Sequence, residues 1–411
     1  MINRESIENN LRHLKHLVFE VTDACNLNCK YCAYSDLYSG YDPREGKMMS
    51  FDKARLMIDY FLNLRKYPQD MYLPLTIGFY GGEPLLNMKL IRQIIEYLEK
   101  VPDTKKYIKY NMTTNAMLLD KCMDFLVEKS FSLTISLDGD ETGQSYRVDF
   151  NGNNSFNRII KNVELLKKKY PFFFDKFVNF RAVLHKRNSV ESIFHFIQDK
   201  FGKIPSFSPL SVSGIKKEKI SKFRSMFQNM EESYLNSSDC EALDAGMFLR
   251  SPRIDGLTKY IFERSGNVFD TFNHLIFEPV RDTLSTGTCI PFSKKLFVTV
   301  SGKILPCERI DHDFVLGHVS DNSVELLDLD VIVEKHNYYV NKIAEQCKYC
   351  GCNSQCPQCV YNIDDIREEK ASCLMFCTHE QQQKRIEGLH DYLREHPFYY
   401  KKILKEVYVK S

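Results

Sequence analysis

The chain has 411 residues, of which 43% are hydrophobic and 27% are charged, and its formal net charge at pH 7 is +2. This length allows two or three domains with sizeable cores. The near-balanced charge gives no sign of a nucleic-acid partner. No apolar run approaches the roughly 18 residues of a membrane span, and residues 1–17 lack the apolar stretch of a signal peptide. We therefore expect a cytoplasmic protein that binds no nucleic acid and no membrane.

The cysteines are the main signal in the composition. Twelve of the 14 lie in two groups, three within residues 25–32 and nine within residues 289–377. Thiols stay reduced in the cytoplasm, so grouped cysteines indicate metal ligands before disulfides. The other two, Cys122 and Cys240, are expected to be buried core thiols.

From residue 16 onward, short β-branched runs alternate with segments of helical period, which predicts βαβ units and a parallel sheet. Six such units favour a partial barrel whose chemistry lies at the carboxyl ends of the strands. The expected helices include 51–66, with Ser50 as N-cap, and 157–169. The expected strands are 16–22, 75–80, 107–114, 132–139, 177–184 and, more weakly, 206–212.

The second half of the chain changes character. Residues 223–235 are expected to be helical and to close the barrel, residues 295–305 to form a hairpin, and the last 30 or so residues to be mostly helical. A thiol-rich segment with short apolar runs is usually held together by metal. The predicted fold is α/β: a partial (βα)6 TIM-like barrel over 1–235, a bridging region over 236–285, a small cysteine-rich domain over 286–380 and a helical tail over 381–411.

The first group, Cys25, Cys29 and Cys32, follows the first strand with C-x3-C-x2-C spacing. Three thiolates can hold three irons of a cubane and leave the fourth iron open. A structural zinc site needs four ligands, and the next cysteine is as distant as Cys122. A zinc site completed by a distant ligand, or three unrelated thiols, are the alternatives.

The segment VTDACNLNCKYC resembles the radical S-adenosylmethionine (SAM) superfamily. The resemblance implies a [4Fe–4S] cluster on Cys25, Cys29 and Cys32, whose open iron binds the amino and carboxylate groups of SAM. One electron then cleaves SAM to a 5′-deoxyadenosyl radical, which abstracts a substrate hydrogen. Tyr31 stands where the family has an aromatic residue near the cluster and adenine, although ordinary core packing is an equal alternative.

Further blocks match the SAM-binding loops of that family. Gly81, Gly82, Glu83 and Pro84 follow the second strand and resemble the GGEP motif, which contacts the SAM amino group; the alternative is a turn with an exposed glutamate.

Polar residues at the ends of the third and fourth strands extend this similarity. Ser136 and Asp138 lie on one face of ISLDG and could bind a ribose diol, and Arg147 could pair with the SAM carboxylate. Asn115, after the third strand, is a further candidate. All four could instead be caps at strand ends.

The second group of cysteines resembles the SPASM domain, a C-terminal extension of radical SAM proteins that holds auxiliary [4Fe–4S] clusters. The resemblance implies Cys347, Cys350, Cys356 and Cys377 for a distal cluster, and Cys289, Cys307 and Cys359 for an inner one. Together with the SAM-binding cluster, this gives three [4Fe–4S] clusters.

The spacing departs from the family at several points. Cys356 and Cys359 are separated by two residues rather than three, and Cys352 and Cys373 are extra, so that either could be a fourth ligand or replace an assigned one. Zinc is the alternative metal, since C-x2-C also occurs in zinc ribbons.

Radical SAM proteins with SPASM domains mostly modify ribosomally made peptides. We therefore expect an oxidoreductase that forms a thioether, ether or carbon–carbon cross-link in a precursor peptide, with an electron donor such as flavodoxin or ferredoxin. The first strand begins too early for an N-terminal leader-binding module, so leader recognition would fall to a separate leader-binding protein, to residues 213–285, or be unnecessary.

Two alternatives stay open. An anaerobic sulfatase-maturating enzyme, which makes formylglycine, bears an acidic general base directly after the cysteine equivalent to Cys307, and Glu308 occupies that position here. A solvent-facing Glu308 is the plainer interpretation. The third possibility is a metal-stabilised peptide-binding module without turnover.

Overall fold

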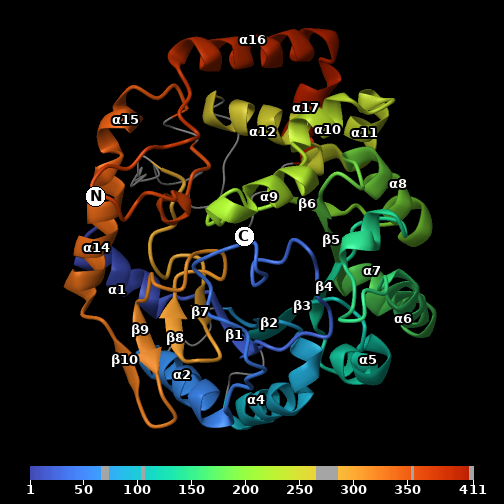
Figure 1. Ribbon diagram of the computed structural model, residues 1–411. Helices are drawn as coiled ribbons and strands as arrows, with labels where there is room; N and C mark the ends of the chain where they lie inside the picture. The colour runs from blue at the N-terminus through green and yellow to red at the C-terminus, as the bar shows by residue number, and fades with distance from the viewer. Residues whose placement is uncertain (66–73, 103–106, 265–285, 353–355, 407–411) are drawn as a thin grey trace. The chain divides into compact units, whose positions relative to one another are not determined.

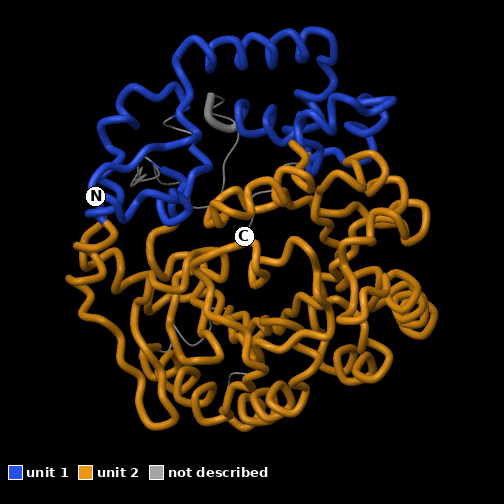
Figure 2. Tube along the Cα trace, viewed as in Figure 1, with its two compact units in different colours: residues 1, 230–288, 337–411 blue, residues 2–229, 289–336 orange. Residues whose placement is uncertain are grey.

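The computed structural model describes residues 1–65, 74–102, 107–264, 286–352 and 356–406. It contains two compact units, which Figure 2 shows in orange and blue. The barrel unit comprises residues 2–229 and 289–336, and the cysteine-rich unit comprises residues 1, 230–288 and 337–411. These units divide the chain differently from the predicted domains, because residues 289–336 join the sheet of the barrel.

The barrel unit contains a ten-stranded sheet in the order β10-β9-β8-β7-β1-β2-β3-β4-β5-β6. Strands β1 to β6 pair in parallel with their neighbours in sequence. This confirms the predicted α/β class and its parallel core. The six strands are β1 (His16–Thr22), β2 (Leu75–Gly81), β3 (Ile108–Thr114), β4 (Ser132–Ser136), β5 (Val178–Leu184) and β6 (Ser206–Pro209).

Helices cover the outer face of this curved sheet (Figure 1). In α4, for example, Leu90, Ile94 and Leu98 recur at helical spacing and are buried, as expected for a helix that packs one apolar stripe on a sheet. Ser50 caps α2 by accepting from the backbone N–H of Lys53, as predicted. The helices of this unit are α1 (Arg4–Arg12), α2 (Phe51–Leu64), α4 (Met88–Lys100), α5 (Leu119–Glu128), α6 (Phe156–Lys169), α7 (Pro171–Phe177), α8 (Val190–Phe201) and α9 (Ile220–Met226).

The sheet continues beyond β1 with residues from much later in the chain. β7 (Leu296–Val298) pairs in parallel with β1, and β8 (Lys303–Leu305) returns antiparallel to it, so the predicted hairpin is confirmed. β9 (Gly317–Val319) and β10 (Val324–Leu326) complete the edge. α14 (Leu329–Lys342) then runs from the barrel unit into the cysteine-rich unit.

The prediction of one continuous helix over residues 223–235 is wrong. The chain leaves α9 at Phe227, which adopts extended backbone angles. A new helix begins only at Met230.

The cysteine-rich unit is mostly helical, and the tail predicted to be helical forms two helices there. Its apolar core joins α12 to the two tail helices through Ile254, Leu257, Tyr392 and Ile403, among others. The helices are α10 (Met230–Leu235), α11 (Cys240–Met247), α12 (Pro252–Arg264), α15 (Ala344–Lys348), α16 (His379–Glu395) and α17 (Phe398–Glu406).

The two isolated cysteines differ in burial. Cys122 is buried on α5, as predicted. Cys240 is only partly buried at the start of α11, where its thiol donates to the carbonyl of Tyr234, so the expectation of a fully buried thiol is wrong there.

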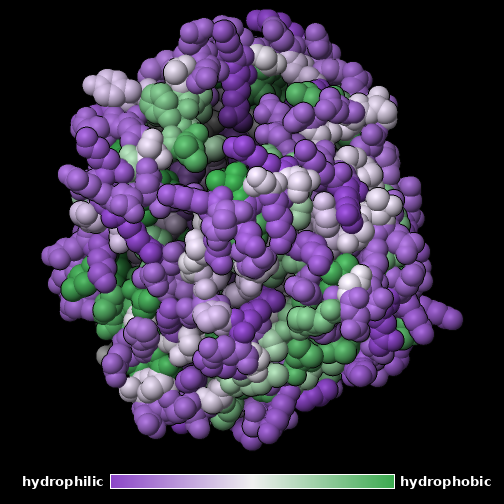
Figure 3. All heavy atoms as spheres, in the orientation of Figure 1, coloured by the Kyte–Doolittle hydropathy of each residue, from purple (hydrophilic) through white to green (hydrophobic). Residues whose placement is uncertain are grey.

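The face of the molecule shown in Figure 3 is covered mainly by hydrophilic side chains, with small hydrophobic patches between them. Among the described helices, none combines the length and apolar composition that crossing a bilayer requires.

Candidate active site

The three cysteines of the first group lie in the loop that leaves the carboxyl end of β1. Burial raises the pKa of the Cys25 thiol, and it raises the pKa of Cys29 to about 12; both thiols also lie within electrostatic reach of Cys32. Buried thiols of this kind become thiolates when a metal binds them. In the described residues, no three Cys, His, Asp or Glu side chains are placed to share one metal ion. The loop thus brings the three thiols together, and the [4Fe–4S] cluster on them stays a prediction.

Three nitrogen donors point at these sulfur atoms. The backbone N–H of Leu27 and the amide Nδ2 of Asn115 lie 3.4 Å and 3.8 Å from Cys25 Sγ. Arg44 Nη2 lies 3.4 Å from Cys32 Sγ, and its guanidinium also stacks on the ring of Tyr34. Such donors stabilise thiolates and tune a bound cluster. Sequence reasoning missed Arg44, since a single arginine in a loop belongs to no recognisable spacing.

The Gly-Gly-Glu-Pro turn holds the base of the cysteine loop. The N–H groups of Gly82 and Glu83 donate to the carbonyls of Thr22 and Ala24, each over 2.9 Å. A Cβ atom on Gly82 would lie 2.0 Å from the Ala24 oxygen, and Gly81 has a φ of +132°. Only glycines allow this close approach, so the turn fixes where the loop leaves β1.

Glu83 is buried, and the alternative of a turn with an exposed glutamate is therefore wrong. Its carboxylate accepts from the hydroxyl of Thr114 at 2.6 Å and from the backbone N–H groups of Asn115 and Leu85 at 2.7 and 3.1 Å. Burial nevertheless raises its pKa. Pro84 opens a short 3-10 helix, Pro84–Asn87. The turn thus joins the exits of β1, β2 and β3 into one rigid corner, and its contact with the SAM amino group stays a prediction.

Asn115 lies between this corner and the cysteine loop. Besides approaching Cys25, its side-chain amide donates to Asn26 Oδ1 at 2.7 Å. Its own Oδ1 accepts from the N–H of Met117 at 3.0 Å. The structure therefore brings this predicted residue beside the first cysteine.

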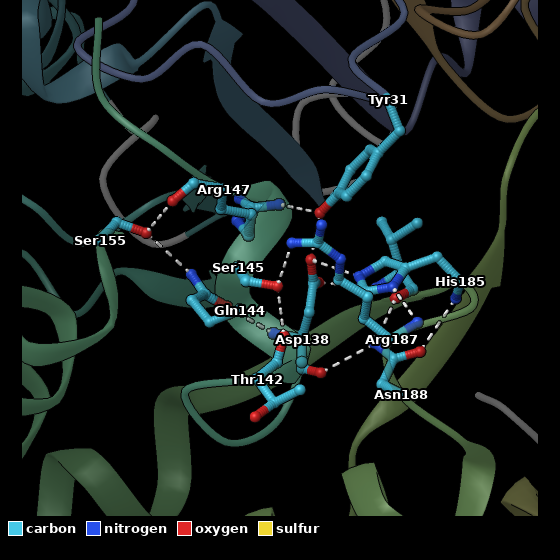
Figure 4. A network of polar contacts seen from close by, with 12 residues as sticks. Tyr31, Asp138, Thr142, Gln144, Ser145, Arg147, Ser155, His185, Arg187 and Asn188 are labelled. Atoms are coloured by element: carbon cyan, nitrogen blue, oxygen red, sulfur yellow. Dashed lines mark hydrogen bonds and ion pairs between the residues drawn. The ribbon is translucent and has the colours of Figure 1, made fainter. Parts of the chain in front are cut away.

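A buried polar network connects the cysteine loop to the exit of β4 (Figure 4). The Tyr31 hydroxyl donates to Asp138 Oδ2, and Arg147 Nη1 donates to the Tyr31 oxygen at 3.0 Å. Asp138 Oδ1 accepts from the N–H of Val183 at 2.8 Å, and His185 Nε2 lies 3.7 Å from Oδ2. Tyr31 is thus hydrogen-bonded to both Asp138 and Arg147 in the interior, while Arg147 Nε has no hydrogen-bond partner among the described residues.

This network fixes the protonation of two of its members. Burial raises the pKa of Tyr31 well above its ordinary value, so the hydroxyl keeps its proton. Burial alone would lower the pKa of Arg147, but Tyr31, Cys29 and Asp138 outweigh it and raise the pKa, so the guanidinium stays charged. A charged, buried arginine beside the cysteine loop is suited to bind a carboxylate.

The backbone of Asp138 is held just as firmly. Its N–H donates to Gln144 Oε1, and its carbonyl accepts from Asn188 Nδ2, both at 2.9 Å. Ser136, at the end of β4, is partly buried. The predicted ribose contact of Asp138 and Ser136 stays a prediction, because both carboxylate oxygens of Asp138 already have protein partners.

Glu308 is not the solvent-facing residue of the plainer interpretation. Its side chain is 10% exposed, and its two oxygens accept from Lys295 Nζ at 2.9 and 3.0 Å. Burial opposes ionisation, but the Lys295 charge outweighs it and lowers the pKa of Glu308. The thiol of Cys307 donates to the same carboxylate at 3.4 Å, and burial raises its pKa to about 12. An ionised carboxylate is therefore held beside a predicted cluster ligand.

The nine later cysteines are divided between the two units. Of the predicted inner-cluster ligands, Cys289 and Cys307 belong to the barrel unit and Cys359 to the cysteine-rich unit. Within the cysteine-rich unit, the residues that line one small pocket include Cys347, Cys350, Cys356 and Cys373. The remaining two cysteines, Cys352 and Cys377, interact electrostatically, and their thiols donate to Gln382 and to the carbonyl of Thr378.

Comparison with known proteins agrees with this geometry. Residues 19–198 match the family model described as the radical SAM superfamily. The cysteine-type anaerobic sulfatase-maturating enzyme of Clostridium perfringens strain 13 is 25% identical over 376 residues, or 86% of this chain and 91% of that protein. The radical SAM cyclopropyl synthase TigE of Paramaledivibacter caminithermalis is 28% identical over 42% of this chain and 36% of its own length.

The fold is also similar to a solved structure, native anSMEcpe with bound AdoMet and Cp18Cys peptide, with a TM-score of 0.60 and 20% identity over 95% of this chain and 98% of that one. The chain spans about half or less of the length of the first curated relatives that it matches. The matched region contains the cysteine loop, the Gly-Gly-Glu-Pro turn and the buried network around Tyr31. Residues 19–198 of this chain are therefore similar to the radical SAM superfamily, and the chain has a fold similar to that of a solved enzyme with bound AdoMet.

Proposed function

We propose that this enzyme uses SAM to oxidise a side chain of a peptide or protein substrate by hydrogen abstraction. The observation that carries the proposal is the loop of Cys25, Cys29 and Cys32, where three thiols and three nitrogen donors converge at the carboxyl ends of the strands. Three protein ligands leave one corner of a [4Fe–4S] cluster for SAM. When bound, that cluster supplies the electron that cleaves SAM to methionine and the 5′-deoxyadenosyl radical.

The chain's own residues prepare the site for this cofactor. Arg44 offers a positive charge at Cys32, and Asn115 holds the first cysteine in place. The Arg147 guanidinium, held by Tyr31, is the candidate partner of the SAM carboxylate. The Gly-Gly-Glu-Pro turn is the candidate site for its amino group. Together these groups orient SAM and keep water from the sulfur atoms.

The auxiliary clusters are part of the proposal. An oxidised product requires that an electron leave the substrate, and clusters bound by the later cysteines supply a path for it. Flavodoxin or ferredoxin is the proposed donor for SAM cleavage, and a separate leader-binding protein is proposed for substrates with a leader.

Glu308 is the proposed general base. Its carboxylate is ionised because of Lys295, and it lies next to Cys307. Loss of a hydrogen atom and then an electron from a side chain also requires loss of a proton, which an ionised, largely buried carboxylate can accept.

The products differ between two candidate substrates. An intrapeptide thioether, ether or carbon–carbon cross-link is the first, and the similarity of the barrel to TigE, named a cyclopropyl synthase, supports chemistry of that kind. Formylglycine formation in a sulfatase is the second. It is favoured by the similarity to a sulfatase-maturating enzyme along nearly the whole of both chains.

Mass spectrometry separates these products. The reduced enzyme would be incubated anaerobically with SAM and with either a peptide encoded beside its gene or a sulfatase-derived peptide containing cysteine. Loss of two hydrogens without an oxygen label from water indicates a cross-link, and replacement of the thiol sulfur by oxygen indicates formylglycine. The same peptides would also be prepared with deuterium on their side chains. If 5′-deoxyadenosine forms but takes up no deuterium from either peptide, the proposal of peptide oxidation fails.

A further inference from the structure

The cysteine-rich unit holds more thiols than one distal cluster needs. Five of them, Cys347, Cys350, Cys356, Cys373 and Cys377, are candidates for four ligand positions. The family resemblance implies Cys377 as the fourth ligand. The contacts of the described residues favour Cys373 instead.

Cys373 lies with the other three ligands. It lines the same small pocket as Cys347, Cys350 and Cys356, and it interacts electrostatically with Cys350 and Cys356. Four thiols around one cavity are the donor set that a [4Fe–4S] cluster with full protein ligation requires.

The backbone beside Cys373 is pinned to the helix that carries Cys347. Gln346, the residue before Cys347 on α15, accepts from the N–H of Cys373 at 3.0 Å and donates to the carbonyl of Ala371 at 2.7 Å. Asp365 accepts from the N–H of Ser372 through both carboxylate oxygens, at 3.1 and 3.0 Å. Cys373 is therefore fixed in place by partners that do not depend on a metal.

Cys377 lies directly before the start of α16, and its backbone is bonded to the residue that follows Cys350. Its carbonyl accepts from the N–H of Gly351 at 2.8 Å, and a Cβ atom on Gly351 would lie 2.9 Å from the Thr378 oxygen. The thiol of Cys352 donates to Gln382 on α16 at 3.0 Å, and the thiol of Cys377 donates to the carbonyl of Thr378 at 3.5 Å. The two thiols also interact electrostatically. These two cysteines thus form a pair beside the pocket and do not line it.

We propose that Cys347, Cys350, Cys356 and Cys373 ligate the distal auxiliary cluster, and that Cys352 and Cys377 form a separate pair of free thiols. The inference rests on the auxiliary clusters of the proposed function and does not depend on the substrate. It places Cys352, a thiol without iron, two residues after the cluster ligand Cys350.

Alkylation of the full chain tests this assignment directly. The protein would be reconstituted anaerobically with iron and sulfide, treated with iodoacetamide, and digested for peptide mass spectrometry. We expect Cys352 and Cys377 to be modified and Cys373 to be protected until the cluster is removed with a chelator. Protection of Cys377 with modification of Cys373 would overturn the assignment, as would modification of all five candidate ligands in the loaded protein.

Single variants give a second measurement. Cys373→Ala should lose about four irons and four sulfides per chain, whereas Cys377→Ala and Cys352→Ala should match the wild type. Cys240→Ala, which removes a partly buried thiol bonded to Tyr234, is the matched control. If Cys373→Ala does not fold, the alkylation result still decides.

Formation of 5′-deoxyadenosine by Cys373→Ala keeps the two proposals distinguishable. We expect SAM cleavage with dithionite to persist in this variant, because the first three cysteines are unchanged. If the ligand assignment fails but SAM is still cleaved, the proposed function stands. If the wild-type protein does not cleave SAM, the proposed function fails.

Discussion

Single residues of the active site act through buried charges and donors that come from distant parts of the chain. Arg44 reaches Cys32 from 12 residues further on, and Arg147 reaches Tyr31 across 116 residues. The cysteines could be predicted from their spacing, and Arg147 from its place after ISLDG. Arg44 could not, because its role depends on how a loop folds back and not on a local pattern.

Arg44→Gln should weaken the SAM-binding cluster. The change removes a positive charge and a donor 3.4 Å from Cys32 Sγ, and losing such a supporting group typically costs about 10–100-fold in metal affinity or activity. The rate of 5′-deoxyadenosine formation and the electron paramagnetic resonance signal of the reduced cluster measure it. Arg92→Gln, which removes a guanidinium stacked on Phe125 outside the site, is the control. Equal rates for the two variants would contradict this role of Arg44.

The burial of Glu20 predicts that the stability of the folded protein depends on pH. It lies on β1 with 2% exposure, between the Tyr34 hydroxyl and the N–H of Val300, each at 2.9 Å. Burial raises its pKa from 4.5 to about 7. Between those pH values the folded protein holds a proton that the unfolded chain has released, so this residue lowers stability as pH rises from 4.5 to 7.

Glu20→Gln imitates the protonated acid and should remove that dependence. Relative to wild type, its free energy of unfolding should rise by about 3 kcal/mol between pH 4.5 and pH 7 and stay constant above. Urea denaturation at pH 5, 6, 7 and 8, followed through the barrel unit, measures the difference. A difference that does not change with pH would show that Glu20 is already ionised at pH 5.

Among the elements, the parallel strands could be predicted almost completely. Alternation and β-branching identified β1 to β6, and the ends of the first three were right to within one residue. The membership of β7 in the same sheet could not be predicted, because three residues pair with a strand some 280 positions earlier. The break after Met226 was also missed, since helical spacing continues across it in the sequence.

The close contact between the exits of β1 and β2 gives a prediction at this scale. Gly82→Ala would place a Cβ atom 2.0 Å from the Ala24 oxygen, and neither backbone can move without disturbing the cysteine loop. We expect a destabilisation of about 3 kcal/mol or more and loss of the SAM-binding cluster, measured by thermal unfolding and iron content. Gly256→Ala, where a Cβ atom meets nothing within 4 Å, is the control. A Gly82→Ala protein with full iron content would contradict the proposed role of the turn.

Across the whole molecule, the chain divides into two units whose boundaries cut through the predicted domains. The sequence shows where the cysteines lie, but the unit to which each belongs follows from long-range pairing. In the cysteine-rich unit, buried Asp244 accepts from the hydroxyls of Tyr234 at 2.6 Å, Tyr392 at 2.7 Å and Ser251. The tail helix α16 is thereby bonded to α11, and the same carboxylate holds α10 and the residue before α12.

Tyr392→Phe should loosen this unit selectively. Removing one hydroxyl from a buried carboxylate costs about 2 kcal/mol, so amide hydrogen exchange should accelerate in α16 and α12. Tyr400→Phe, at a partly exposed position of α17, should have little effect. Equal acceleration throughout β1 to β6 would contradict the division into units.

Release of 5′-deoxyadenosine tests the account most directly. The wild-type protein, loaded anaerobically with iron and sulfide and reduced with dithionite, should convert SAM to 5′-deoxyadenosine and methionine. A variant with Cys25, Cys29 and Cys32 all changed to alanine should form none while keeping the iron bound by its later cysteines. Equal 5′-deoxyadenosine from both proteins, or none from a fully loaded wild type, would contradict the claim that these three thiols hold the cluster that cleaves SAM.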